Sequence, residues 1–225
     1  MRKRTKVQGP NLPARTFIAR ERQPWIFFAL LLAVLVHYAL GWLWALPLWG
    51  LTLFLVWLFR DPSRTIPSAP LAVVSPVDGR VVAVEPVQDA YLQREAMRIS
   101  ILMNWKSVFF TRSPIEGKVM QVWYSPGGLL PPSHEAAASQ NQRIALWIQT
   151  DEGDDIVLVL IAGPLARPVC YANTGMRMGQ GQRCGFIPFG SRVDVLLPSN
   201  VRVAVKPGDN VLAGSTIIAT LVHKS

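Results

Sequence analysis

The sequence predicts a mostly β domain that is preceded by a helical hairpin. Three observations favour this fold class. An apolar run over residues 25–59 contains no Lys, Arg, Asp or Glu. From residue 71 onward, short runs of alternating apolar residues are separated by turn signals, which is typical of strands. In that second part no window keeps a helical period for long. The 225 residues leave room for one such domain with an appendage.

The first 24 residues are predicted to form a basic cytoplasmic tail. They carry a net charge of +6 out of the +9 of the whole chain. A nucleic-acid-binding protein would spread its basic residues over a folded surface with aromatic platforms, so we expect no nucleic-acid partner. Basic residues beside an apolar segment instead indicate attraction to an anionic lipid surface. The apolar run that follows is too long for a signal peptide and lacks a cleavage site.

The length of the apolar run 25–59 favours two short helices. One helix of this length would extend roughly 50 Å, whereas the hydrocarbon core of a bilayer is about 30 Å thick. We expect a membrane helical hairpin that breaks between Gly41 and Gly50, around Pro47, as two slightly short helices or a shallow re-entrant pair. Arginines also follow the run, so both ends should face the cytoplasm. The expected location is the inner membrane, with the β domain on its cytoplasmic side.

Residues 60–70, "RDPSRTIPSAP", are predicted to form a linker because Pro and Ser dominate them. The β domain is expected over residues 71–225. In it, "TDEGDD" at 150–155 lies between two alternating apolar runs and predicts a hairpin. "SPVDGRV" at 75–81 recurs as "SPIEGKV" at 113–119. This repeat predicts two equivalent turns, in which each glycine has a positive φ beside an acidic residue.

The early "SPVDG" together with the late "VKPGDNVLAGSTIIATL" at 205–221 resembles the crossed, flattened β-barrel of biotinyl and lipoyl domains. Carrier domains of that type present a lysine at a hairpin tip, whereas the comparable stretch "GMRMGQ" has Arg177. A swinging-arm carrier is therefore disfavoured. Cys170 and Cys184 lie in apolar, strand-like contexts and are expected to be reduced core residues. We expect no metal, because no Cys or His cluster has ligand spacing.

Several motifs occur in order through almost the whole chain. Together they resemble the motifs of the phosphatidylserine decarboxylases of the short, membrane-anchored bacterial and archaeal type. The motifs are "LFRDP" (58–62), "SPVDG" (75–79), "RISILMN" (98–104), "RSPIEG" (112–117), "FGSRVDVLLP" (189–198) and "VKPGDNVLAG" (205–214). The "FGSRVD" element is specific. The resemblance implies a lyase that converts phosphatidylserine, a phospholipid of the membrane, to phosphatidylethanolamine.

The resemblance also implies that the chain cleaves itself between Gly190 and Ser191. The Ser191 hydroxyl would attack the Gly190 carbonyl and convert the amide to an ester, and β-elimination would leave a pyruvoyl group derived from Ser191. Residues 1–190 and 191–225 would then form a heterodimer. Glycine tolerates a strained backbone, and serine is a nucleophile once a base removes its proton. The pyruvoyl group would condense with the substrate amine and act as the electron sink for CO₂ loss.

Members of this family are expected to assist the serine with an acid in the "SPxDG" turn, which is Asp78 here, and with a histidine in a motif like D-V-H-V-N-R-x-P. In this chain the second motif is "SVFFTRSP", with Ser107 at the acid position and Phe109 at the histidine position. Phenylalanine cannot relay the protons that histidine does near neutral pH. Three explanations stay open: a substitute base such as His134, a slow enzyme that uses Asp78 and water, or a decayed site.

Arg112, Arg143 and Arg167 are candidate ligands for the substrate's phosphate or carboxylate, because a guanidinium binds either group in bidentate fashion. Two alternatives to an active enzyme remain. One is a non-cleaving pseudoenzyme of the same family. The other is a membrane-fusion adaptor of an export system, which also joins a membrane segment to a lipoyl-like barrel. Such an adaptor needs a long coiled coil, which this chain lacks.

Overall fold

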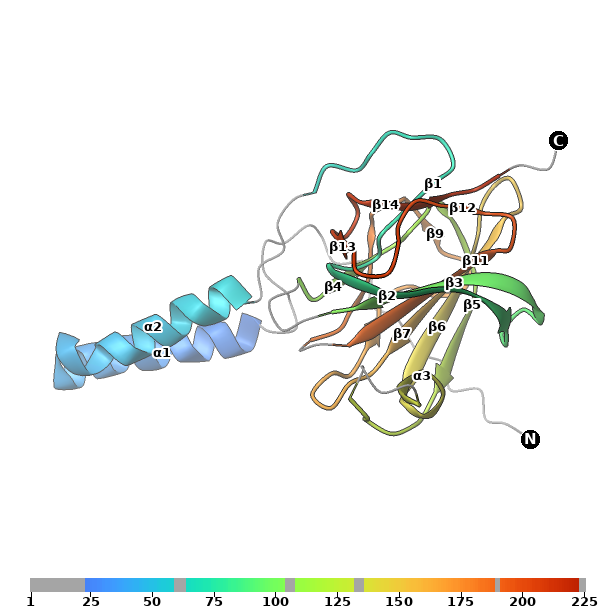
Figure 1. Ribbon diagram of the computed structural model, residues 1–225. Helices are drawn as coiled ribbons and strands as arrows, with labels where there is room; N and C mark the ends of the chain where they lie inside the picture. Colours follow the sequence, from blue (N-terminus) through green and yellow to red (C-terminus); the bar gives the residue numbers. More distant parts are fainter. Residues whose placement is uncertain (1–22, 59–63, 104–107, 132–135, 189–190, 223–225) are drawn as a thin grey trace. The chain divides into compact units, whose positions relative to one another are not determined.

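The computed structural model describes residues 23–58, 64–103, 108–131, 136–188 and 191–222. These residues divide into two compact units, a pair of helices and a β-rich domain that begins at Arg64 (Figure 1). A mostly β fold preceded by a helical hairpin is therefore confirmed. The basic tail lies outside the described residues, apart from its last two positions. Phe59 and the first four residues of the predicted linker lie outside them as well.

Helices α1 (Gln23–Leu40) and α2 (Trp42–Leu58) pack against each other as a hairpin. The chain reverses at Gly41, whose φ of 91° suits glycine and strains other residues. The break thus lies within the expected range from Gly41 to Gly50, at its first position, but the expectation that it lies around Pro47 is wrong. Pro47 lies inside α2, where it lacks one backbone hydrogen bond without ending the helix. The left-handed glycine, and not the proline, makes the turn.

The buried side chains of the two helices are small, and the large ones are exposed. Ala29, Ala33, Ala45 and Thr52 are buried, which allows two helices to approach closely. Exposed apolar side chains cover much of the rest, including Trp25, Phe27, Phe28, Leu35, Leu43, Trp44 and Leu53. No helix in the described part of the chain combines the length and the apolar character needed to cross a membrane.

The β-rich domain is built from short and medium strands and one short helix. They are β1 (Ala72–Val74), β2 (Gly79–Asp89), β3 (Arg94–Leu102), β4 (Phe110–Arg112), β5 (Gly117–Ser125), α3 (Ala137–Gln140), β6 (Arg143–Gln149), β7 (Asp155–Ile161), β8 (Val169–Cys170), β9 (Arg177–Met178), β10 (Arg183–Phe186), β11 (Arg192–Pro198), β12 (Arg202–Val203), β13 (Asn210–Val211) and β14 (Ile217–Thr220).

The strands form one large and two small antiparallel sheets. The large sheet has the order β13-β2-β3-β11-β7-β6-β5-β9 and curls into a half-barrel (Figure 1). The small sheets have the orders β1-β14-β12 and β4-β10-β8. The predicted hairpin at 150–155 is confirmed, because it joins β6 to β7 with Gln149 opposite Asp155. Strand β11 lies inside the large sheet, between β3 and β7.

The main core lies on one face of the large sheet. Val193, Val195 and Leu197 of β11 contribute to it, together with Ile and Leu residues of β3, β6 and β7. The opposite face carries a smaller apolar cluster, which includes Leu196 and Ile161. Both faces of β11 are therefore covered, and from Val195 to Pro198 its sequence is continuously apolar.

The two related turns at 75–81 and 113–119 are equivalent in structure. The Ser75 hydroxyl donates to the carbonyl of Val77 at 2.7 Å, and the Ser113 hydroxyl donates to that of Ile115 at 2.7 Å. Each turn leads directly into a strand of the large sheet, β2 in the first case and β5 in the second. The sequence repeat therefore corresponds to two copies of one local structure.

The expected positive φ at the glycines of these turns is wrong, because neither Gly79 nor Gly117 is among the residues with positive φ. Space is the reason for glycine instead. A Cβ atom at Gly79 would lie 2.4 Å from the carbonyl oxygen of Leu102, and one at Gly117 would lie 2.4 Å from that of Gln149. The neighbouring strand leaves no room for a side chain at either position.

We predict that Gly117→Ala destabilises the protein, because the new methyl group would have to displace the backbone of Gln149. Overpacking of this kind costs about 1–3 kcal/mol. The measurement is thermal unfolding of the full chain in detergent. Gly179→Ala is the control, because its Cβ would meet only the end of the Gln182 side chain at 3.6 Å. An equal melting temperature for the two variants would contradict this account of the turn.

Candidate active site

Ser191 lies at one end of the large sheet, directly before β11. Arg192, the first residue of β11, pairs with Leu102 of β3 and with Ile161 of β7. The carbonyl of Ser191 accepts a hydrogen bond of 2.8 Å from the amide of Met103, so the β3–β11 ladder extends to the serine. Gly190, on the other side of the predicted cleavage bond, lies outside the described residues. The register thus places Ser191 where the central strand starts.

The Ser191 side chain is fully buried and has one weak hydrogen-bond partner. Its exposed fraction is 0%, and its Oγ donates to the Sδ atom of Met103 at 3.5 Å. A thioether is a weak acceptor. Within the described ranges, no acidic or basic side chain hydrogen-bonds this hydroxyl. Among the described residues, one weak interaction therefore holds this buried hydroxyl.

Asp78 lies at the same end of the sheet as Ser191, on the other side of β3. It precedes β2, in which Arg80 pairs with Leu102, the residue that also pairs with Arg192. The strands β2 and β11 are thus separated by two strand spacings, about 10 Å. The structure therefore brings the predicted acid to the same end of the sheet as the serine, with β3 between the strands that follow them.

The Asp78 carboxylate is buried, and both its oxygens accept hydrogen bonds from other groups. The Arg64 guanidinium donates to Oδ2 at 2.8 Å, and the Ala213 amide donates to Oδ1 at 2.7 Å. In addition, the Ser215 hydroxyl donates to the Thr65 carbonyl at 3.1 Å, so the linker is tied to this end of the domain. In the sequence, Arg64 is one of the arginines that follow the apolar run 25–59. Its partner became visible only in the fold.

Phe109, at the expected histidine position, is buried just before β4. Its carbonyl accepts a 2.8 Å hydrogen bond from the amide of Ile187, which is four residues before Ser191. The ring of Phe109 packs edge-on against the ring of Phe186, with the two centroids 6.1 Å apart. The ring of Phe110 also packs edge-on against Phe186, with a centroid distance of 5.4 Å. An aromatic cluster therefore lies beside the segment that leads to Ser191, and the ring at 109 offers no proton relay. Ser107 and His134 lie outside the described residues.

The three candidate arginines occupy different surroundings. Arg112 ends β4, and its guanidinium donates to the Gly181 carbonyl at 3.0 Å. Its amide donates to the Pro76 carbonyl, which places it beside the turn that carries Asp78. Arg143 opens β6 and pairs with Ile161, in the same row as Arg192.

The guanidinium of Arg143 has partners in the described part of the chain, whereas that of Arg167 has none there. Arg143 donates to the Ser139 carbonyl at 2.6 Å and to the Tyr91 hydroxyl at 3.3 Å. Burial raises the pKa of Tyr91, so this hydroxyl stays protonated. Arg167 is exposed in the loop between β7 and β8. Of the three arginines, Arg167 is the most accessible to a ligand.

A buried polar network follows directly after Ser191, and sequence reasoning missed it. Arg192 donates from Nε to Oδ1 of Asp194 at 2.7 Å, and its terminal nitrogen donates to Oγ of Ser100 at 2.9 Å. Both charged residues belong to the quoted motif "FGSRVD". Their spacing of two residues could have indicated a shared face of a strand.

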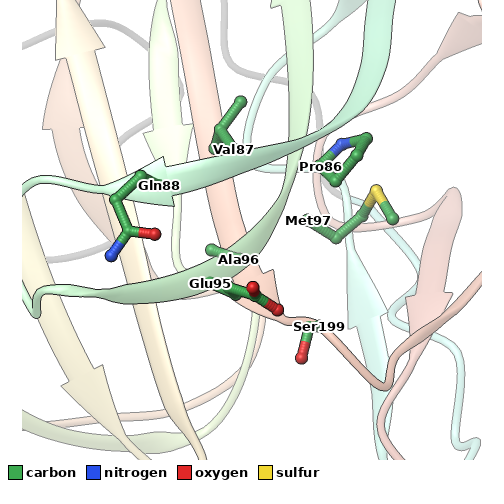
Figure 2. Close-up of a pocket in the computed structure, with 7 residues that line it drawn as sticks. All are labelled: Pro86, Val87, Gln88, Glu95, Ala96, Met97 and Ser199. Atoms are coloured by element: carbon green, nitrogen blue, oxygen red, sulfur yellow. The ribbon is translucent and has the colours of Figure 1, made fainter.

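A cavity of about 330 Å³ lies at the other end of β11 from Ser191 (Figure 2). It is lined by Pro86, Val87, Gln88, Glu95, Ala96, Met97 and Ser199. Ala96 and Met97 pair with the last residues of β11, so the cavity and the serine lie at opposite ends of this strand.

No group of three His, Cys, Asp or Glu side chains that could hold a metal ion is found among the described residues.

Comparison with known proteins identifies the family. The family model for phosphatidylserine decarboxylase matches residues 51–219. A phosphatidylserine decarboxylase proenzyme of Nitrosomonas europaea is 49% identical over 203 residues, which cover 90% of this chain and 94% of the relative. The proenzyme of Aromatoleum aromaticum is 46% identical over 205 residues, with 91% and 95% covered. That of Burkholderia ambifaria is 48% identical, with 91% and 96% covered.

The chain belongs to the phosphatidylserine decarboxylase family. The resemblance drawn from the motifs is thereby confirmed, as is the prediction of a carboxy-lyase of this family. The family match leaves the export adaptor without support. The individual site residues stay predictions, because neither the match nor the identity assigns a role to any of them.

The two cysteines lie on neighbouring strands of the small sheet β4-β10-β8, and both are free thiols. Burial raises the pKa of Cys170 to about 11 and also raises the pKa of Cys184. We predict that iodoacetamide at pH 8 labels both at least about a hundredfold more slowly in the native protein than in guanidinium, because the thiolate reacts. Labelling is followed by mass spectrometry. Rapid labelling of native Cys170 would contradict the assigned burial.

Proposed function

We propose that this chain is a phosphatidylserine decarboxylase proenzyme that cleaves itself between Gly190 and Ser191. The observation that carries the proposal is Ser191 itself. It is fully buried at the start of the central strand, and within the described ranges its hydroxyl donates only to a thioether. Relatives of 46–49% identity over about nine-tenths of the chain are named as proenzymes. The surroundings of Ser191 therefore fit a pyruvoyl group formed from this residue.

In the proposed cleavage, the Ser191 Oγ attacks the Gly190 carbonyl carbon, and the peptide bond becomes an ester as the nitrogen takes up a proton. Elimination then releases Gly190 as a carboxylate and leaves residue 191 unsaturated. Water hydrolyses its amine, ammonia leaves, and a pyruvoyl group remains. That group supplies an electrophilic carbonyl, which binds the amine of phosphatidylserine and accepts electrons as CO₂ departs.

Asp78 is the side chain that we assign to proton removal from Ser191, together with a water molecule. Asp78 precedes β2, which is separated from β11 by β3, so the strands that carry the two residues lie about 10 Å apart. A bridging water would carry the proton between the two side chains. Phe109 fills the position where a histidine is expected and cannot take part. General base assistance is worth roughly 10²- to 10⁴-fold, so we expect slow self-cleavage. His134 is the alternative base.

Arg167, Arg112 and Arg143 are proposed to bind the phosphate or carboxylate of the substrate. Arg167 is exposed near the end of β7, at the same end of the sheet as Ser191. Arg112 lies beside the turn of Asp78, and its guanidinium already donates to Gly181. We therefore assign the first contact with the substrate anion to Arg167. Arg112 and Arg143 would give up their hydrogen bonds to the carbonyls of Gly181 and Ser139 and donate to the substrate anion instead.

The two products of cleavage are proposed to remain together as one folded unit. The smaller chain would contain β11 to β14. In the structure β11 is bonded to β3 on one side and to β7 on the other, and β14 pairs with β1. Separating the products would break these ladders and expose the core residues of β11.

The curled sheet and the repeated turns support, as a further proposal, a likeness to the flattened barrel of biotinyl and lipoyl domains.

The helical hairpin is proposed to hold the enzyme at the cytoplasmic face of the inner membrane, where its phospholipid substrate lies. The large apolar side chains of α1 and α2 are exposed, with 68% for Phe27 and 69% for Leu53. A contiguous apolar surface of this kind requires apolar surroundings. The basic residues of positions 1–24 would attract anionic lipid.

The first test is the intact mass of the purified full chain beside a Ser191→Ala variant. We expect the wild type to separate under denaturing conditions into residues 1–190 and 191–225, the second with a pyruvoyl end, and to form phosphatidylethanolamine from phosphatidylserine. The variant should remain one inactive chain because it lacks the nucleophile. The wild-type fragments should co-purify without denaturant.

Two further variants locate the base. Asp78→Asn should slow cleavage of the full chain, whereas His134→Ala should leave its rate unchanged. If His134→Ala slows cleavage and Asp78→Asn does not, His134 is the base that takes the proton from Ser191. A wild type that stays uncut after long incubation would establish the pseudoenzyme instead.

Membrane attachment is tested by flotation with vesicles of phosphatidylethanolamine and phosphatidylglycerol. Because a charged residue in a hydrocarbon-embedded helix costs about 2.5–3.5 kcal/mol, we expect Phe27→Asp with Leu53→Asp to reduce the floated fraction at least about tenfold. Tyr124→Asp is the control, because Tyr124 is also well exposed, at 59%, but belongs to β5. Equal flotation of the two variants would argue against a hairpin anchor.

A further inference from the structure

We propose that Arg192, Asp194 and Ser100 form a register lock, which holds the start of β11 against β3 so that the Gly190–Ser191 bond is presented for cleavage. The inference rests on the proposed function, because it concerns the same bond. The three side chains are positioning residues: they act on Ser191 through the backbone that joins them to it. Neither the family match nor the motif resemblance assigns them a role.

The lock joins two strands through side chains on one face. Arg192 and Asp194 are two residues apart in β11 and therefore point to the same face. Their side chains form an ion pair at 2.7 Å. Ser100 is the register partner of Asp194 on β3, and its hydroxyl accepts a 2.9 Å hydrogen bond from the Arg192 guanidinium. The Arg192–Ser100 hydrogen bond thus joins the two strands one residue from Ser191, and the ion pair extends the network to Asp194, three residues from Ser191.

The charges of the lock are buried in an otherwise apolar strand. Arg192 is 9% exposed and Asp194 is 4% exposed, while Ser100 is fully buried. Removing two charges from water costs energy that their attraction recovers only in good geometry. Replacing such a pair by apolar residues of similar volume is often neutral or stabilising. Stability alone therefore does not explain a buried ion pair here, and the specification of one register is the better explanation.

The apolar pattern of β11 leaves its register ambiguous. Val193, Val195 and Leu197 alternate on the core face. A shift of β11 by two residues would keep apolar side chains on that face, because the side-chain period of a strand is two. Such a shift would move Ser191 away from Met103 by about 6.6 Å. The polar network opposes it, because in the observed register Asp194 lies opposite Ser100 and the Arg192 guanidinium donates to the Ser100 hydroxyl, and a shift would break this arrangement.

A matched control pair lies on the same face of the same sheet. Arg98 of β3, two residues from Ser100, forms an ion pair with Glu85 of β2. Arg98 pairs in register with Leu196, so this ion pair is four residues further along β11 from Arg192. Its hydrogen bond joins Arg98 and Glu85 and does not include the network beside Ser191. The link between the two pairs is electrostatic: the pKa of Glu85 is lowered mainly by Arg98 and, to a smaller extent, by the charge of Arg192.

The test compares two double variants of the full chain, Arg192→Met with Asp194→Leu and Glu85→Leu with Arg98→Met. The rate of self-cleavage and the melting temperature are measured for each. We expect the first pair to slow cleavage at least tenfold while its melting temperature stays near that of the wild type. The control pair should cleave at the wild-type rate. Arg192→Lys, which keeps the charge, should cleave at an intermediate rate. If the Arg192→Met, Asp194→Leu variant cleaves at the wild-type rate, the register lock is overturned.

A second measurement does not depend on cleavage. Each double variant is also made in the Ser191→Ala background, and amide hydrogen exchange is followed by mass spectrometry. Exchange in residues 191–195 should rise at least tenfold without the lock and stay unchanged without the control pair. Unchanged exchange would overturn the inference even if cleavage slowed. If the wild type never cleaves, the proposed function fails, and this exchange comparison still decides whether the lock exists.

Discussion

The antiparallel pairing of β11 with β3 and β7 is the constraint on which the rest of the site depends. Along its whole length β11 pairs with β3, and its other edge pairs with β7. This position buries both faces of the strand and places Ser191 where the ladder begins. It also explains how a chain could be cut beside its central strand and stay folded, since the strand is held from both sides.

The same end of the sheet gathers groups from distant parts of the chain. The turn before β2 supplies Asp78, and the linker supplies Arg64 as its partner. The segment before β4 supplies Phe109 in place of a histidine. These residues differ in what holds them: an ion pair fixes the carboxylate, whereas aromatic packing fixes the phenylalanine. The site therefore combines a firmly bound acid with an apolar wall.

Local sequence patterns were sufficient for the class of fold and for the family. Alternating apolar runs and turn residues are local signals, so they predicted the β-rich domain and the hairpin of β6 and β7. Reasoning about glycine was less successful. The proline signal points to Pro47, whereas the chain reverses at Gly41, and the turn pattern predicts a positive φ that Gly79 and Gly117 do not have. Their real constraint is the carbonyl of a neighbouring strand, which no local pattern reveals.

By itself the sequence determined the fold class, the family and the serine on which the proposed chemistry centres, because each depends on residues that are adjacent or regularly spaced. Only the tertiary structure decided which groups meet. The partners of Asp78 are 14 and 135 residues away in the chain, and Ser100 is 92 residues from Arg192. Contacts of that range follow from strand order and register. Those in turn result from the packing of the whole sheet and not from any one segment.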